Sequence, residues 1–373
     1  MSLALLDNPV LPSRSRAHAW LLDLRTQWRN SSLQLIERCN HPDRPIARAY
    51  VAQIERPRPQ DYAAYHDLLV GMSVQGSDRE AVATSLLARA PRLAAGQAGL
   101  ALPRLTNFSA GFYAYEARSL MSRWLGLGMG MEVDGRARLG CISGPRYMAQ
   151  SSLVRRAMRC LACHAPEAHD EITQVVSEIV LCTVDASGDE RFAWRSACSF
   201  AVWGAVFLDP THHADELDYL CSVVEEGARL ALFAASLRQP LVMAPPTSVD
   251  GLVAERQNAQ LETMDARIHA AFAAARLAHV LQRLQDATWP GDHPVPRTAS
   301  LRRGWIPMPW SVERLQLAHA RATARFWANH AALSNSRWLS PAGRELMHQT
   351  CVFMAHAYGW PDPVQMKNSK NDN

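Results

Sequence analysis

The sequence SFAVWGAVFLDP (199–210), followed at once by THHADELDYLCSVVEEGARLALFAA (211–235), decides the fold that we expect for this chain. The first segment is rich in aromatic and β-branched residues and ends in Asp-Pro, which is typical of a strand or hairpin that ends in a turn. In the second segment apolar residues recur at helical spacing behind a group of acidic residues. The sequence therefore predicts a strand–helix unit within residues 192–237, with its helix over about 214–237.

Helical spacing also dominates the rest of the chain, so the predicted fold class is mainly α with a small β hairpin (α+β), a multi-helix globular domain. Ser340 is the expected N-cap of the last helix. The other expected helices cover residues 15–38, 61–71, 78–100, 151–163, 171–183, 250–286, 312–333 and 341–358.

Changes in composition along the chain suggest its domain limits. A glycine-dense stretch (126–145) separates an N-terminal helical region, residues 1–140, from a helical domain at 141–360. A turn signal rather than a helix follows the glycines, so we interpret the stretch as a structural loop or hairpin and not as a phosphate-binding loop. Residues 361–373 form a polar tail.

Composition excludes several classes of protein. The 373 residues are 48% apolar and 20% charged, as in an ordinary globular protein, and the formal net charge is only +4. No cluster of Lys and Arg dominates, so we expect no nucleic-acid partner. There is no run of 18 apolar residues and no export signal, so we expect no membrane partner and a cytoplasmic location. The eight cysteines are then expected to be reduced thiols.

Glu225, Glu226 and Arg229 are the first candidate site, because they lie among apolar residues of the predicted helix. Glu225 and Arg229 are four residues apart and could form an ion pair on a solvated helix face. Glu226 lies about 100° further round the helix, on the stripe of Leu230 and Phe233. The functional alternative is a buried pair of carboxylates, one of which has a raised pKa and acts as acid or base.

Two helices carry histidines on one face, and these histidines are candidate axial ligands of a haem. Residues three turns apart cannot bind one ion together, so each helix could give at most one ligand to a site. The alternative is that each histidine makes a single hydrogen bond beside the core. The two stripes consist of His269, Phe272, Arg276 and His279, and of His319, Thr323, Phe326 and His330.

Two shorter motifs complete the candidates. Cys160–Leu161–Ala162–Cys163–His164 matches the C-x-x-C-H haem-attachment pattern; a redox thiol pair and buried inert thiols are the alternatives. His212 and His213 precede Asp215 and Glu216, and we interpret the two acidic residues as favourable charges in the first turn of a helix.

Four segments in order resemble the HExxH-motif peptide-modification family, which is described as α-ketoglutarate-type peptide β-hydroxylases of ribosomally made peptide natural products. The resemblance covers roughly residues 153–347. The segments are SFAVWGAVFLDP (199–210), ADELDYLCSVVEEGARLALF (214–233), ARIHAAFAAARLAHVLQRL (266–284) and WLSPAGRELM (338–347).

Carried over to this chain, the resemblance places the family's first metal histidine at Glu225, its glutamate at Glu226 and its second histidine at Arg229. His269 matches a histidine in the family's following helix. Only the glutamate is kept, and an arginine at the third position is a fixed cation that would repel a divalent metal. The resemblance therefore implies a metal site that has been lost or rebuilt, and the cofactor stays unknown.

Together these features predict an enzyme that modifies a small molecule or peptide in specialised metabolism. Glu226 would be the base, Arg229 would bind a substrate carboxylate, and Glu225, His269 and Arg276 would line the substrate site. One alternative is a haem-dependent oxygenase with an axial histidine among the four named above. The other is a non-catalytic scaffold that binds a peptide or a partner enzyme.

Overall fold

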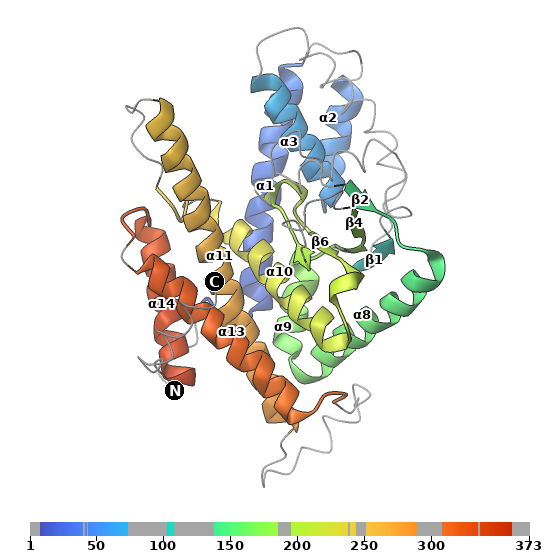
Figure 1. The fold of residues 1–373 in the computed structure, drawn as a ribbon. Helices are drawn as coiled ribbons and strands as arrows, with labels where there is room; N and C mark the ends of the chain where they lie inside the picture. The colour runs from blue at the N-terminus through green and yellow to red at the C-terminus, as the bar shows by residue number, and fades with distance from the viewer. Residues whose placement is uncertain are drawn as a thin grey trace. The chain divides into compact units, whose positions relative to one another are not determined.

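The structure is a computed structural model, and the mainly helical fold predicted from the sequence is confirmed (Figure 1). It describes residues 8–39, 42, 44–73, 103–107, 138–185, 195–237, 239–243, 251–288, 308–334 and 336–359. Within these ranges the α-helices are α1 (Arg14–Glu37), α2 (Arg44–Gln53), α3 (Pro59–Ser73), α8 (Gly144–His164), α9 (Pro166–Val175), α10 (Glu216–Ser236), α11 (Gly251–Thr288), α13 (Val312–Leu333) and α14 (Pro341–Tyr358).

The described strands form a mixed four-stranded sheet in the order β1-β3-β6-β5 and a separate pair, β2-β4. In the larger sheet β1, β3 and β6 run parallel, and β5 is antiparallel to β6, so the expected hairpin is one edge of a larger sheet. The strands are β1 (Arg104–Asn107), β2 (Arg138–Gly140), β3 (Glu178–Leu181), β4 (Thr183–Asp185), β5 (Ser196–Ala197) and β6 (Ala205–Leu208).

The central strands are buried at every position, and this explains their sequences. All four residues of β3 and of β6 are buried, and both strands consist almost entirely of apolar residues. A parallel strand covered on both faces has no solvent side to fill with polar residues. The same absence of alternation makes a short strand difficult to distinguish from a helix, and the helix that we expected over 171–183 is wrong: α9 ends at Val175 and β3 follows.

The chain divides into two compact units. Unit 1 comprises residues 1–14, 156–172 and 223–373, and unit 2 comprises residues 15–155 and 173–222. Each unit is therefore built from segments that are far apart in the sequence. The domain limits that we expected at residues 140 and 360 stay a prediction.

Unit 1 contains the helices α11, α13 and α14, which contact one another. Five alanines in the middle of α11 are almost completely buried, and their small side chains let the neighbouring backbone approach closely; they are Ala271, Ala273, Ala274, Ala275 and Ala278. Ser311 and Ser340 cap α13 and α14, each accepting a hydrogen bond from a backbone N–H in the first turn of its helix. The predicted limits of both helices are confirmed.

Unit 2 contains α1, α2, α3 and the larger sheet. Tyr62 of α3 packs between the rings of Trp28 on α1 and Trp203, with centroid separations of 5.9 and 5.5 Å. The three helices line a cavity of about 30 Å³, space for roughly two water molecules. Trp28 Nε1 and Ser32 Oγ belong to this lining and have no hydrogen-bond partner among the described residues.

Other expectations differ from the structure or concern residues that it does not describe. The proline-rich segment between α1 and α3, for which no helix was expected, contains the ten-residue helix α2. The helix expected at 78–100, most of the glycine-dense stretch and the tail lie outside the described residues. In the part of the chain that the structure describes, no helix is both long and apolar enough to cross a bilayer.

Candidate functional site

The turn between β6 and α10 is fixed by two aspartates. Asp209 accepts hydrogen bonds from the backbone N–H and the hydroxyl of Thr211, both at 2.8 Å. Asp215 accepts from the N–H groups of Leu217 and Asp218, at 3.0 and 3.2 Å, and so satisfies the open amino end of α10. The predicted strand–turn–helix order is confirmed.

Glu226 and Arg229 are paired on α10 in unit 1. The Nη1 atom of Arg229 donates to both carboxylate oxygens of Glu226, at 3.2 and 3.3 Å. The Glu226 side chain is only 1% exposed, whereas that of Arg229 is 32% exposed. A buried carboxylate thus lies beneath a guanidinium that solutes can reach. The pair that we expected between Glu225 and Arg229 is not the one that forms.

His269 of α11 lies beside this pair and is buried. Its ring lies 4.3 Å from that of Phe233, one helical turn beyond Arg229. Burial, with the nearby charge of Arg229, lowers the pKa of His269 to about 3, so the imidazole is neutral at ordinary pH. Its Nδ1 atom has no hydrogen-bond partner among the described residues, and Nε2 is 3.8 Å from Asp265 Oδ2, too far for a hydrogen bond.

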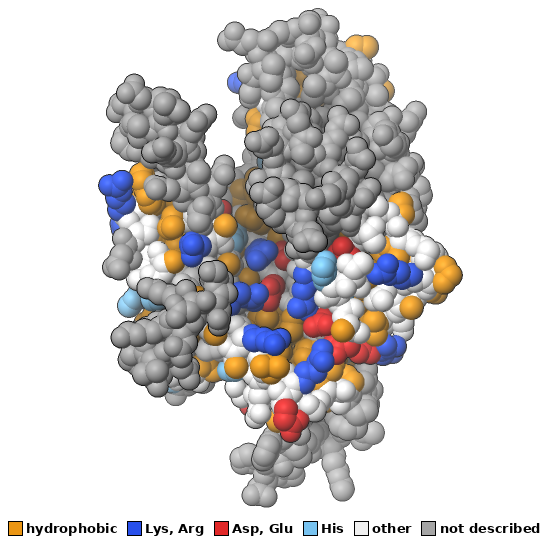
Figure 2. Space-filling model, in the orientation of Figure 1, with side chains coloured by type: hydrophobic (Ala, Val, Ile, Leu, Met, Phe, Trp, Pro, Cys, Tyr) orange, Lys and Arg blue, Asp and Glu red, His pale blue; other side chains and the backbone are white. Residues whose placement is uncertain are grey.

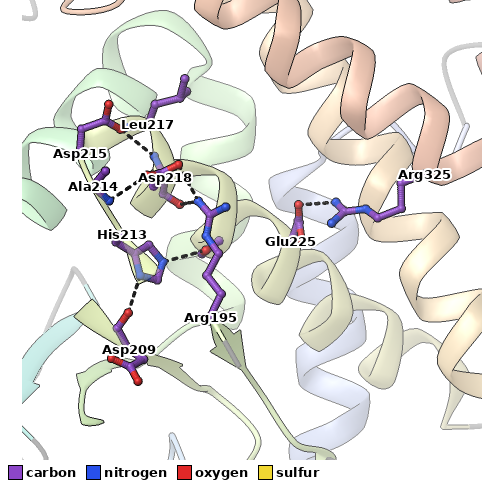
Figure 3. A network of polar contacts seen from close by, with 10 residues as sticks. Arg195, Asp209, His213, Ala214, Asp215, Leu217, Asp218, Glu225 and Arg325 are labelled. Carbon is purple, nitrogen blue, oxygen red and sulfur yellow. Dashed lines mark hydrogen bonds and ion pairs between the residues drawn. The ribbon is translucent and has the colours of Figure 1, made fainter. Parts of the chain in front are cut away.

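Glu225 points toward a different helix. Its carboxylate forms an ion pair with Arg325 of α13, and Figure 3 shows the two side chains extending toward each other. Figure 2 shows acidic and basic side chains gathered in the middle of the face, where Figure 1 draws α10 and α13. Glu225 therefore serves as a link between two helices of unit 1.

Arg276, expected to line the substrate site, is in a buried cluster of its own. It pairs with Glu171 of α9, and both side chains are 3% exposed. Its Nη2 atom donates to the backbone oxygen of Pro9 at 2.7 Å, while Glu171 accepts from the N–H of Ser13 at 2.7 Å. The guanidinium also lies over the ring of Phe272, 4.7 Å from its centroid. These contacts hold the N-terminal segment against two helices.

The residues of α10 do not fit the metal that the family resemblance implies. Two of the three aligned positions hold Glu225, engaged by Arg325, and Arg229, engaged by Glu226. A fixed cation at the third position opposes a divalent ion. The described residues contain no group of three or more His, Cys, Asp or Glu side chains that could hold a metal ion. These three side chains of α10 therefore do not form a divalent-metal site.

The four candidate haem ligands each contact an aromatic ring. His269 lies on Phe233, His279 contacts Phe353 edge-on, His319 contacts Tyr358 edge-on, and His330 stacks on Phe326. Burial lowers the pKa of His279 to about 4 and also lowers the pKa values of His319 and His330. These contacts describe histidines packed beside a core, and the haem interpretation stays a prediction.

The C-x-x-C-H motif lies on the last turns of α8. Cys160 is buried, and its thiol lies 3.6 Å from the sulfur of Met308. Cys163 and His164 are partly exposed. None of the eight cysteines is in a disulfide in the part of the chain that the structure describes.

A buried histidine network in unit 2 was missed by the sequence reasoning. His213 Nδ1 lies 2.7 Å from the backbone oxygen of Asp209 (Figure 3). The Nε2 atom of the same ring lies 2.9 Å from Ser222 Oγ. The ring stacks on Tyr219 at 4.2 Å. Since Nδ1 can only donate to a carbonyl, Nε2 accepts from the serine hydroxyl, which fixes the neutral tautomer. Burial lowers the pKa of His213 to about 4.

Arg195 completes this network from the side of β5. Its Nη2 atom donates to the carboxylate and to the backbone oxygen of Asp218, at 3.0 and 2.7 Å. The other carboxylate oxygen of Asp218 accepts from the N–H of Ala214 at 2.9 Å. The only sequence signal for the network was a histidine at the turn before the helix, where two acidic residues gave a sufficient explanation by themselves.

Comparison with known proteins assigns no family. No protein-family model matches the chain, and a search of curated proteins finds no significant relative. The resemblance to the HExxH-motif peptide-modification family therefore stays a prediction.

Proposed function

We propose that this chain modifies a small molecule or peptide in specialised metabolism, at a site formed by α10 and α11. The observation that carries the proposal is the buried Glu226 paired with the partly exposed Arg229, beside His269, whose Nδ1 atom has no hydrogen-bond partner among the residues that the structure describes. A buried polar atom without a partner costs stability, and such groups are concentrated at functional sites. The family resemblance supports the choice of specialised metabolism.

Each of the three side chains has a role in this proposal. Arg229 binds a substrate carboxylate through charge-assisted hydrogen bonds, which are stronger than neutral ones. Binding of that carboxylate draws the guanidinium away from Glu226, which becomes available to remove a proton from the substrate. His269, kept neutral by burial, hydrogen-bonds to the substrate through Nδ1 without adding charge.

The binding step is tested with N-acetylphenylalanine and its amide as probes, because Phe233 offers an aromatic contact beside His269. Calorimetric titration should show that the acid binds and that the amide does not. Arg229→Gln should weaken binding of the acid about 10–100-fold, since one charged hydrogen bond contributes about 1.5–3 kcal/mol. Arg325→Gln is the matched control and should bind normally. Equal affinity for acid and amide would refute the role of Arg229.

The chemical step is tested by co-expression with the peptide encoded nearest to the gene, followed by measurement of the peptide's mass. The native chain should change that mass. Glu226→Gln should abolish the change, while Glu225→Gln, whose partner is Arg325, should preserve it. A mass change that survives Glu226→Gln would remove Glu226 as the base.

A non-catalytic scaffold is the second candidate, and one observation favours it. Glu226 is 1% exposed and already neutralised by Arg229, as in a structural ion pair. A scaffold would bind the peptide equally well with Glu226→Gln and leave its mass unchanged. In both proposals the protein acts in the cytoplasm, which is supported by eight cysteines that form no disulfide among the described residues.

A further inference from the structure

At one end of the small antiparallel pair, two cysteines lie close together in unit 2. Gly140 of β2 lies opposite Thr183 of β4. Cys141 and Cys182 are the next residues beyond this last pair, and Cys141 is close enough to influence the Cys182 thiol; continuing the register by one residue would place them opposite each other. Directly opposite residues in antiparallel strands have Cβ atoms about 4.5–5.5 Å apart, near the 3.5–4.5 Å that a disulfide requires.

Backbone contacts hold both positions. The N–H of Cys182 donates to the backbone oxygen of Leu208 at 3.1 Å, which extends the contact between β3 and β6 by one residue. Next to Cys141, the N–H and C=O of Ile142 both bond to the Asn107 side chain, at 3.3 and 2.8 Å. The two cysteines are therefore kept close by the sheets on each side of them.

The two thiols differ in their access to solvent. Cys182 is completely buried, whereas Cys141 is exposed. Burial raises the pKa of the Cys182 thiol well above its usual value, and the nearby Asp209 and Cys141 raise it further. Cys182 is thus protected from solutes, and Cys141 is the sulfur that an oxidant meets first.

We propose that Cys141 and Cys182 are a reversible disulfide site, oxidised by low-molecular-weight disulfides such as glutathione disulfide. The Cys141 thiolate attacks glutathione disulfide, forms a mixed disulfide and releases one glutathione thiolate, which takes the proton that Cys141 lost. The Cys182 sulfur then attacks the Cys141 sulfur, the second glutathione leaves, and it takes the Cys182 proton. One glutathione disulfide becomes two glutathiones, and the two protein thiols become one disulfide.

The site is tested on the full chain by equilibration with defined ratios of oxidised and reduced glutathione. The free thiols are then alkylated, and the peptides are mapped by mass spectrometry without reduction. We expect one linked peptide pair that contains Cys141 and Cys182, the loss of two thiols, and full reversal by dithiothreitol. Glutathione that accumulates on Cys141 while Cys182 stays reduced would overturn the proposal. So would a link at Cys160 and Cys163 in its place.

Single substitutions distinguish the order of the two steps. Cys182→Ser should leave glutathione attached to Cys141, and Cys141→Ser should leave Cys182 reduced, because solutes do not reach it. Cys351→Ser, a buried cysteine of α14, is the matched control and should form the disulfide as the native chain does. Glutathione on Cys182 in Cys141→Ser would contradict the proposed order.

Thermal unfolding gives a second readout that needs no variant at the buried position. The disulfide closes the loop from 141 to 182 and restricts the unfolded chain, so oxidation should raise the melting temperature of the native chain by several °C. It should not raise that of Cys141→Ser. An identical shift in both chains would show that the stabilising reaction occurs elsewhere.

Discussion

Arg276 shows how much can depend on one buried side chain. It pairs with Glu171, donates to Pro9 and covers the ring of Phe272. A charge that is buried away from water needs an oppositely charged partner to offset its lost hydration. Removal of one member of the pair leaves the other charge buried without this compensation.

Arg276→Met should therefore lower the free energy of unfolding by about 3–5 kcal/mol, measured by urea denaturation. Removal of both charges in Glu171→Leu/Arg276→Met should cost less than the sum of the two single variants, since only the double variant leaves no buried charge behind. A single-variant loss below about 1 kcal/mol would show that water reaches the pair.

Ser222 is a second side chain whose removal would leave a buried polar partner unsatisfied, because its hydroxyl donates to His213 Nε2. Ser222→Ala should cost about 1–3 kcal/mol, the penalty for a buried acceptor left without a donor. Ser236→Ala in the same helix is the matched control; its hydroxyl only returns to the backbone oxygen of Phe233, so it should cost less than about 0.5 kcal/mol. Equal losses would indicate a general effect of alanine on α10.

At the scale of elements, the start of α14 depends on a glycine. A Cβ atom at Gly343 would meet the backbone oxygen of Leu241 at 2.2 Å, whereas one at Gly144, at the start of α8, would meet nothing within 4 Å. Gly343→Ala should therefore destabilise by about 1–3 kcal/mol or more, as overpacking does. Gly144→Ala should be neutral or stabilising by up to about 1 kcal/mol. Thermal unfolding compares the two, and equal melting temperatures would contradict this close approach.

Helix ends were predictable where the sequence contains a specific cap. Ser311 and Ser340 each precede a helical pattern, and both helices begin where predicted. β3 was not predictable, because four buried residues directly after a helix carry no alternation that would distinguish a strand. Short apolar segments gain their conformation from strands far away in the sequence.

The candidate site was only partly predictable for a related reason. Helical spacing correctly indicated that Glu226 and Arg229 share one helix. It favoured Glu225 as the partner of Arg229, but Glu225 pairs with Arg325, a hundred residues later. An ion pair between helices depends on how those helices pack, and no local spacing contains that information.

For the whole molecule, buried neutral histidines predict sensitivity to acid. The pKa values of His213 and His279 are lowered to about 4 and that of His269 to about 3, against about 6.5 in the unfolded chain. The unfolded state then binds more protons below pH 6.5, so the free energy of unfolding falls as pH is lowered from 6.5 toward 4. Burial raises the pKa values of Asp61 and Glu178, which acts in the opposite direction.

A comparison with His279→Phe isolates one imidazole from these opposing effects. His279 faces Arg276, Arg283, Glu167 and Asp286, and its ring contacts Phe353, which a phenylalanine could also do. Between pH 7.5 and 5 the native chain should lose about 1–2 kcal/mol more stability in urea than the variant. Parallel pH profiles of the native chain and the variant would mean that folding does not lower the pKa of His279.

One backbone segment serves both sheets, because β3 ends at Leu181 and β4 begins at Thr183, with Cys182 alone between them. Neither sheet can lose that segment without disturbing the other. The two sheets should therefore open together, and the amide hydrogens from Ile179 to Val184 should exchange with solvent as one cooperative group. Because the two sheets of unit 2 share this stretch, neither should unfold independently of the other.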